Sequence, residues 1–166
     1  MIWNFIIIGA VVIIFLVLVR KIPVALKIQK EEKSNISLKE INKYSLIAQA
    51  DDAFDEKDFE KAENIYIRAA AQDPGNAKIY NRLGLIYLDR KNYYDAKEAF
   101  LQAAKLEADI ALRHANLGMA YMGLKDYFKA SQSFQKAVEL DPKDKKYRQM
   151  YERAQKVYEK DKNKKK

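Results

Sequence analysis

The sequence predicts an all-α protein, in which a single transmembrane helix at the amino terminus precedes a short solenoid of helical hairpins. Three observations support this prediction. Only five Gly and three Pro occur among 166 residues, which leaves few turn-forming residues for a loop-rich β-sandwich. Residues 1–19 carry no charged side chain. The chain after residue 43 repeats one pattern every 34 positions.

Residues 2–19 form the predicted membrane span. Asn4 is the only clearly polar residue in this run, and as a helix it would be about 27 Å long, close to the thickness of a bilayer's hydrocarbon core. A cleaved signal peptide would need a basic stretch before the run and a small-residue cleavage site after it. Neither is present, so we expect an uncleaved anchor over residues 1–21.

The basic residues after this run predict its orientation. By the positive-inside rule, the carboxy-terminal side lies in the cytoplasm and the amino terminus faces outward, as in a bacterial inner-membrane protein. Residues 22–36 form a basic juxtamembrane linker, which is either an amphipathic stretch at the membrane surface or a solvated stalk. The candidate contacts with the membrane surface are Arg20, Lys21, Lys27 and Lys30.

The next element is the first helix of the repeat domain, which we expect over residues 37–160. Ser37 and Glu40 form a capping box, and Ile36 with Ile41 would form the hydrophobic staple around it. The helix should therefore start near residue 38. The hairpins are predicted at about residues 43–76, 77–110 and 111–144.

The 34-residue period recurs at small, aromatic and capping positions. The repeated sets are Ala62, Ala96 and Ala130; Ala69, Ala103 and Ala137; Tyr66, Phe100 and Phe134; and Asp58, Asn92 and Asp126. Asp or Asn before each second helix is a natural N-cap. Gly84 and Ala96 are both small, as closely crossing helices require. Each hairpin leaves an apolar face that only the next hairpin covers.

The pattern resembles that of the tetratricopeptide repeat family, W-x2-L-G-x2-Y followed by A-x3-F, A and P. The matching residues are Leu83, Gly84, Tyr87, Ala96 and Phe100 in the second repeat and Leu117, Gly118, Tyr121, Ala130, Phe134 and Pro142 in the third. The first repeat matches mainly in its second half. Apolar residues at helical spacing after Pro142 predict a capping helix over residues 144–160, followed by a disordered basic tail, residues 161–166.

In that family, the first helices of successive repeats line a concave groove that holds a partner peptide or helix. The resemblance implies a groove lined by Ile47, Asp51, Phe54, Lys78, Asn81, Leu85, Leu88, Leu112, Ala115, Met119 and Met122. Its Leu and Met residues suit an apolar or amphipathic segment. We expect an acidic end at Asp51 and a basic end at the capping helix, which includes Arg153. The alternative is that the capping helix or the linker fills part of the groove.

Some family members hold a partner's terminal carboxylate with a Lys, Asn, Asn, Lys, Arg clamp. Those positions here are Ile47, Asp51, Arg82, Leu112 and Asn116, which disfavours that mode of binding. We expect a protein-interaction module that recruits or scaffolds a partner at the cytoplasmic face of a membrane. The alternative is a structural subunit of a membrane or envelope complex that acts through self-association.

The composition also restricts the chemistry. No Cys excludes disulfides, thiolate nucleophiles and Cys-ligated zinc, and a single His excludes a multi-histidine metal centre. The sequence contains no Gly-rich phosphate loop, metalloprotease helix motif or nucleophile elbow. We therefore expect no catalytic residues, no metal and no cofactor. The formal charge of +8 comes from basic segments around a mildly acidic middle, and we do not expect nucleic-acid binding.

Overall fold

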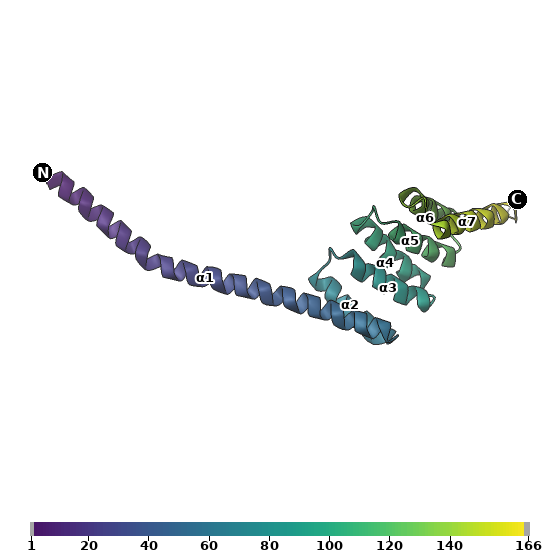
Figure 1. The fold of residues 1–166 in the computed structure, drawn as a ribbon, viewed down its shortest axis with the longest axis horizontal. Coiled ribbons are helices and arrows are strands. Elements are labelled where there is room, and N and C mark those ends of the chain that lie inside the picture. The colour runs from purple at the N-terminus through teal and green to yellow at the C-terminus, as the bar shows by residue number, and fades with distance from the viewer. Residues whose placement is uncertain (1, 165–166) are drawn as a thin grey trace. The chain divides into compact units, whose positions relative to one another are not determined.

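The computed structural model describes the backbone of residues 2–164 and the side chains of residues 27–38 and 40–164. Within this part of the chain the regular elements are all α-helices, which confirms the predicted fold class there (Figure 1). They are α1, Ile2–Asp55; α2, Phe59–Gln72; α3, Ala77–Asp89; α4, Tyr93–Leu106; α5, Ala111–Gly123; α6, Tyr127–Leu140; and α7, Lys145–Lys164.

The chain divides into two compact units, Met1–Tyr44 and Ser45–Lys166, and the boundary falls within α1. In the first unit, the described side chains are almost all exposed to solvent. Among the described residues, no helix has a stretch long and apolar enough to cross a bilayer. The predicted span, residues 1–21, lies outside the residues whose side chains are described.

The predicted start of the first repeat helix near residue 38 is wrong. Helix α1 runs through the predicted linker, residues 22–36, and through the capping box without a break. The two staple residues, Ile36 and Ile41, are 58% and 61% exposed. Residues 27–33 are rich in Lys, Glu and Gln, which favour helix, and contain no Gly or Pro that would end it. The capping-box residues therefore lie inside a helix that begins upstream.

The second unit is a solenoid of helical hairpins. The last turns of α1 pair with α2, α3 pairs with α4, α5 pairs with α6, and α7 follows (Figure 1). The predicted N-caps of the second helices are confirmed. The side chains of Asp58, Asn92 and Asp126 accept hydrogen bonds from the backbone N–H groups three residues later, at 3.1, 3.4 and 3.1 Å. Each cap therefore fixes where its helix begins.

A left-handed residue precedes each of these caps. Lys57, Lys91 and Lys125 have φ angles of 62°, 58° and 61°, again 34 residues apart. In the first turn, the Asp58 N–H donates to the carbonyl oxygen of Ala53 at 2.9 Å, and equivalent bonds of 2.9 and 3.0 Å close the other two turns. This is the Schellman arrangement, which usually places Gly at the left-handed position. Here the same turn is made three times with Lys.

The core of the solenoid is built around one aromatic side chain in each second helix. Tyr66 and Phe100 are fully buried and Phe134 is 2% exposed. A Cβ atom on Gly84 would lie only 2.5 Å from the Phe100 ring, and one on Gly118 would lie 2.7 Å from Phe134. The glycines therefore make room for these rings. The sequence had suggested that Gly84 faces Ala96, and its contact with Phe100 was not predicted.

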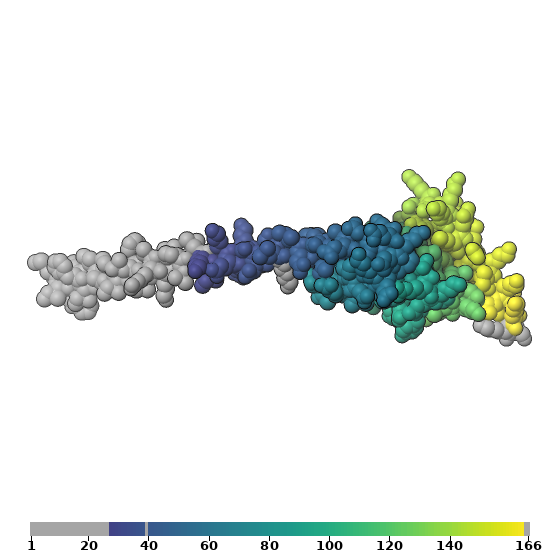
Figure 2. Space-filling model, turned by 90° about the horizontal axis from the view of Figure 1, so that it is seen from below, coloured from purple at the N-terminus to yellow at the C-terminus, as the bar shows by residue number. Residues whose placement is uncertain are grey.

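Helix α7 packs against the last hairpin, as predicted for a capping helix. Ala154 is fully buried in a cluster with Phe134 and Ala137, and Tyr147 packs against the same cluster. Figure 2 shows α7, in yellow, at the carboxy-terminal end of the solenoid. The helix continues to Lys164, so the prediction of a disordered tail is wrong for residues 161–164. Lysines in the last turn of a helix interact favourably with its dipole, which supports this extension.

Candidate functional site

The predicted groove residues fall into two groups. Ile47, Asn81 and Ala115 are 9%, 7% and 2% exposed and pack between helices. Asn116 Nδ2 donates to Asn81 Oδ1 at 2.7 Å, which links α5 to α3. The accessible residues, half-buried or exposed, are Asp51, Phe54, Lys78, Leu85, Leu88, Leu112, Met119 and Met122. These eight residues are the ones with surface available to a partner.

Three of the accessible residues come together in a pocket of about 440 Å³, which we call the methionine pocket. Leu88 lies near the end of α3, and Met119 and Met122 lie one turn apart on α5. The lining is completed by Asp89, Lys91, Tyr93, Phe134, Met150 and Arg153. The pocket therefore joins two successive hairpins and the capping helix.

The wall of the methionine pocket depends on a glycine. Gly123 is the last residue of α5, and a Cβ atom there would lie 2.1 Å from the ring of Tyr93. The missing side chain lets the end of α5 approach Tyr93 closely. Tyr93 was not predicted as a pocket residue because it begins a second helix, whereas the family pattern places groove residues on first helices.

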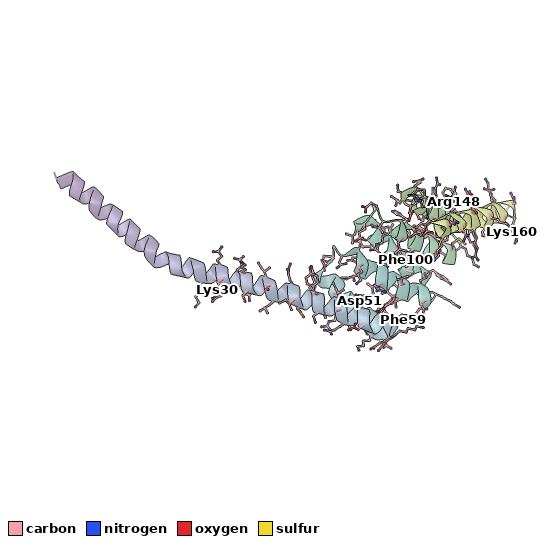
Figure 3. The ribbon with its side chains drawn as sticks, in the orientation of Figure 1. Lys30, Asp51, Phe59, Phe100, Arg148 and Lys160 are labelled. Carbon is pink, nitrogen blue, oxygen red and sulfur yellow. The ribbon has the colours of Figure 1, made fainter. Side chains whose placement is uncertain are left out.

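The first repeat carries a charged cluster around Asp51 instead of a methionine pocket. Asp51 is labelled near the end of α1 in Figure 3. Asp51 Oδ1 accepts a hydrogen bond of 2.6 Å from the Tyr66 hydroxyl and lies 3.2 Å from Nε of Arg82. Its Oδ2 accepts a hydrogen bond of 2.6 Å from Nζ of Lys78. The Arg82 guanidinium also stacks over the ring of Phe54, 4.4 Å from its centroid.

These contacts shift the pKa values of Asp51 and Tyr66. Burial alone would raise the pKa of Asp51, but the hydrogen bonds from Lys78 and Tyr66 and the charges of Lys78 and Arg82 outweigh it, so the pKa is lowered. Burial and the hydrogen bond to Asp51 raise the pKa of Tyr66 above its ordinary value. Two cations therefore surround one carboxylate. The expectation that Asp51 gives the groove an acidic end is wrong, because Lys78 and Arg82 neutralise its charge. These partners lie 27 and 31 residues away in sequence, so the residues around Asp51 give no sign of them.

The five positions of a carboxylate clamp show why this site differs from one. Ile47 and Asn116 are buried, and Arg82 is bound to Asp51. Leu112 is 46% exposed and apolar. Within the described side chains, these positions provide no unpaired cation for a terminal carboxylate.

The remaining candidate groups are explained by local structure. Nε2 of His114 lies 2.8 Å from the carbonyl oxygen of Ala108, in the turn between α4 and α5. Across the described residues, no three His, Asp or Glu side chains are placed to hold a metal ion. Lys27 and Lys30 are exposed on α1, and Nζ of Lys27 lies 4.0 Å from Glu31. Lys30 is labelled on α1 in Figure 3. The side chains of Arg20 and Lys21 lie outside the described residues.

Comparisons with known proteins agree with this geometry. Two family models described as tetratricopeptide repeat match residues 47–110 and 111–144, which together make up more than half of the chain. A search of curated proteins found no match.

Solved structures with a similar fold include three tetratricopeptide repeat domains. The Arabidopsis OM64 domain is 22% identical, with a TM-score of 0.65, over 69% of this chain and 95% of that one. The first domain of Spaghetti (RPAP3), bound to the HSP90 peptide SRMEEVD, is 16% identical, with a TM-score of 0.66, over 70% of this chain and 92% of that one. The second domain of human RPAP3, in complex with the HSP70 peptide SGPTIEEVD, is 24% identical, with a TM-score of 0.63, over 68% of this chain and 98% of that one.

Proposed function

The chain belongs to the tetratricopeptide repeat family, and from this premise we propose that its groove binds a segment of a partner protein and recruits that partner to a membrane. The observation that carries the proposal is the methionine pocket, whose volume of about 440 Å³ is in the range of pockets that bind ligands. Its apolar lining is only partly covered, and methionine side chains adapt to varied shapes. Such a pocket suits a large apolar side chain of a partner segment.

The bound segment differs from the chaperone tails of the structural relatives. The RPAP3 domains were solved with HSP90 and HSP70 peptides. In this chain the clamp positions are apolar, buried or bound to Asp51, which argues against recognition of a free terminal carboxylate. We propose an internal, amphipathic segment that is held by apolar contacts.

Membrane tethering is proposed from the sequence. Residues 2–19 are long and apolar enough to span a bilayer as a helix, and Arg20 and Lys21 directly follow them. By the positive-inside rule, we propose that the repeats lie in the cytoplasm and the amino terminus outside, as in a bacterial inner-membrane protein. A partner that binds the groove would then be concentrated at the cytoplasmic face of the membrane.

Photo-crosslinking in cells tests the groove directly. A benzoylphenylalanine residue replaces Met122 in the pocket, and in a control chain it replaces Tyr94, which is 61% exposed on the second helix α4. We expect a defined adduct with another protein from position 122 and none from position 94. An adduct only from position 94 would contradict the proposed groove. Adducts composed of two copies of the chain would favour the alternative function, a structural subunit that self-associates.

A further inference from the structure

A basic stripe follows the exposed side of α7. It consists of Lys146, Arg153, Lys160 and Lys164, and all four side chains are exposed. Lys146, Arg153 and Lys160 are seven residues apart, so they lie on one face of the helix, and Lys164 follows one turn later. Within the described part of the chain, none of these four side chains forms an ion pair. The stripe is therefore an uncompensated positive surface.

The basic stripe borders the methionine pocket. Arg153, in the middle of the stripe, lines the pocket together with Met150, which lies one turn earlier on α7. Lys91 adds a further positive charge to the pocket lining, and Asp89 adds the one negative charge. Helix α7 has three acidic residues. Glu152 and Glu159 line a separate hollow between α6 and α7, and Asp161, which has an interaction partner of its own, lies between Lys160 and Lys164 in the sequence. An apolar pocket thus adjoins a row of free cations.

The rest of the groove does not reverse this charge. The carboxylate of Asp51 is paired with Lys78 and Arg82, so its negative charge is neutralised within the cluster. A partner segment with acidic side chains would not be repelled by Asp51, because its carboxylate is paired. The same segment would be attracted by the unpaired cations of the stripe. A basic segment would be repelled by the stripe.

We propose that the occupant of the groove is an acidic amphipathic segment of a partner protein, with a large apolar side chain in the methionine pocket and Asp or Glu side chains on the basic stripe. The inference rests on the proposed groove function and adds the charge and orientation of the partner. A protein segment fits better than an anionic membrane surface, because the stripe adjoins a pocket that is lined by two successive hairpins and α7. A flat layer of lipid headgroups has no side chain to fill that pocket.

The test begins with selection of random 12-residue peptides displayed on phage against the full chain in detergent micelles. We expect the recovered peptides to contain one or more large apolar residues flanked by Asp or Glu. A recovered peptide is then labelled with a fluorophore, and its affinity for the chain is measured by anisotropy. The affinity should fall as salt is raised, because salt screens charge attraction between exposed groups.

Two charge-matched variants separate the stripe from net charge. Lys146→Glu with Lys160→Glu changes the stripe, and Lys105→Glu with Lys162→Glu makes the same change in net charge at exposed positions outside it. We expect the stripe variant to weaken peptide binding by about tenfold and the control variant by less than about twofold. Circular dichroism checks that both variants keep their helices.

Each other outcome has a definite meaning. Recovered peptides without an excess of acidic residues would overturn the inference but leave the groove function standing. Equal weakening in both variants would also overturn it, because net charge would then explain the effect. Unchanged affinity in the stripe variant would overturn it and assign the stripe to another contact, such as anionic lipid. Recovery of no binding peptide would contradict the groove function and the inference together.

Discussion

Gly84 shows how a single residue sets the distance between two helices. A Cβ atom at this position would lie 2.5 Å from the ring of Phe100, which is fully buried. Overpacking of this kind costs about 1–3 kcal/mol, against about 1 kcal/mol gained from the higher helix propensity of Ala. We expect Gly84→Ala to lower the free energy of unfolding by about 1 kcal/mol, as measured by urea denaturation.

Gly75 provides the matched control for this prediction. It has no atom within 4 Å of its would-be Cβ and does not adopt a positive φ angle. Gly75→Ala should therefore change the free energy of unfolding by less than about 0.5 kcal/mol. Equal effects of the two substitutions would show that the contact with Phe100 does not limit the packing of α3 on α4.

The Asp51 cluster predicts a dependence of stability on pH. Because the native pKa of Asp51 is lowered, its contribution is present above the unfolded pKa of about 3.9 and is lost as pH falls through the native value. We expect Asp51→Asn to lower the free energy of unfolding by about 1 kcal/mol at neutral pH, since Lys78 is half exposed and its ion pair is partly screened. This deficit should shrink below pH about 4.

Urea denaturation at several pH values measures this dependence. Asp52→Asn is the control, because Asp52 is exposed and no side-chain partner of it occurs among the described residues. The control should have little effect at any pH. A deficit for Asp51→Asn that stays constant from neutral pH to pH 2 would contradict the assigned ion pairs.

At the scale of elements, the left-handed turns between paired helices carry removable strain. Lys125 has a φ of 61°, a conformation that disfavours residues with a Cβ atom. We expect Lys125→Gly to raise the free energy of unfolding by about 0.5–1 kcal/mol. The control, Lys136→Gly in the interior of α6, should lower it by about 1 kcal/mol. Destabilisation by both substitutions, measured by thermal unfolding, would argue against strain at the turn.

The sequence predicted the elements whose signals repeat and missed those without a local signal. The 34-residue period located the hairpins and the N-caps Asp58, Asn92 and Asp126 correctly. The left-handed residues were missed because Gly or Asn usually occupies such positions and here Lys does. The capping box at Ser37 was misleading, because that motif starts a helix only where the chain before it is not helical.

The candidate site was predicted in part, for similar reasons. The family pattern selected Leu88, Met119 and Met122, which the structure brings into one pocket. Met150, one of the apolar residues after Pro142 that predicted the capping helix, packs against the core and also lines the pocket. The neutralisation of Asp51 could not be predicted, because Lys78 and Arg82 reach it only after two helices have folded back on each other.

At the scale of the whole molecule, the proposed topology is testable because the chain has no cysteine. A single substitution, Asn163→Cys, introduces one thiol at the exposed end of α7. We expect a membrane-impermeant maleimide to leave this thiol unlabelled in intact bacterial spheroplasts and to label it after lysis. Labelling before lysis would contradict a cytoplasmic repeat domain. Deletion of residues 2–19 should move the chain from the membrane fraction to the soluble fraction.

The central claim is that a partner segment occupies the groove at the methionine pocket. The chain contains four methionines, and three of them, Met119, Met122 and Met150, line this pocket. The most direct test is NMR of the full chain carrying ¹³C-labelled methionine methyl groups, with a selected peptide added stepwise. We predict that the three pocket methyl resonances shift in proportion to occupancy while the Met1 resonance stays in place. Saturated peptide binding with no shift of the three pocket resonances would contradict the claim.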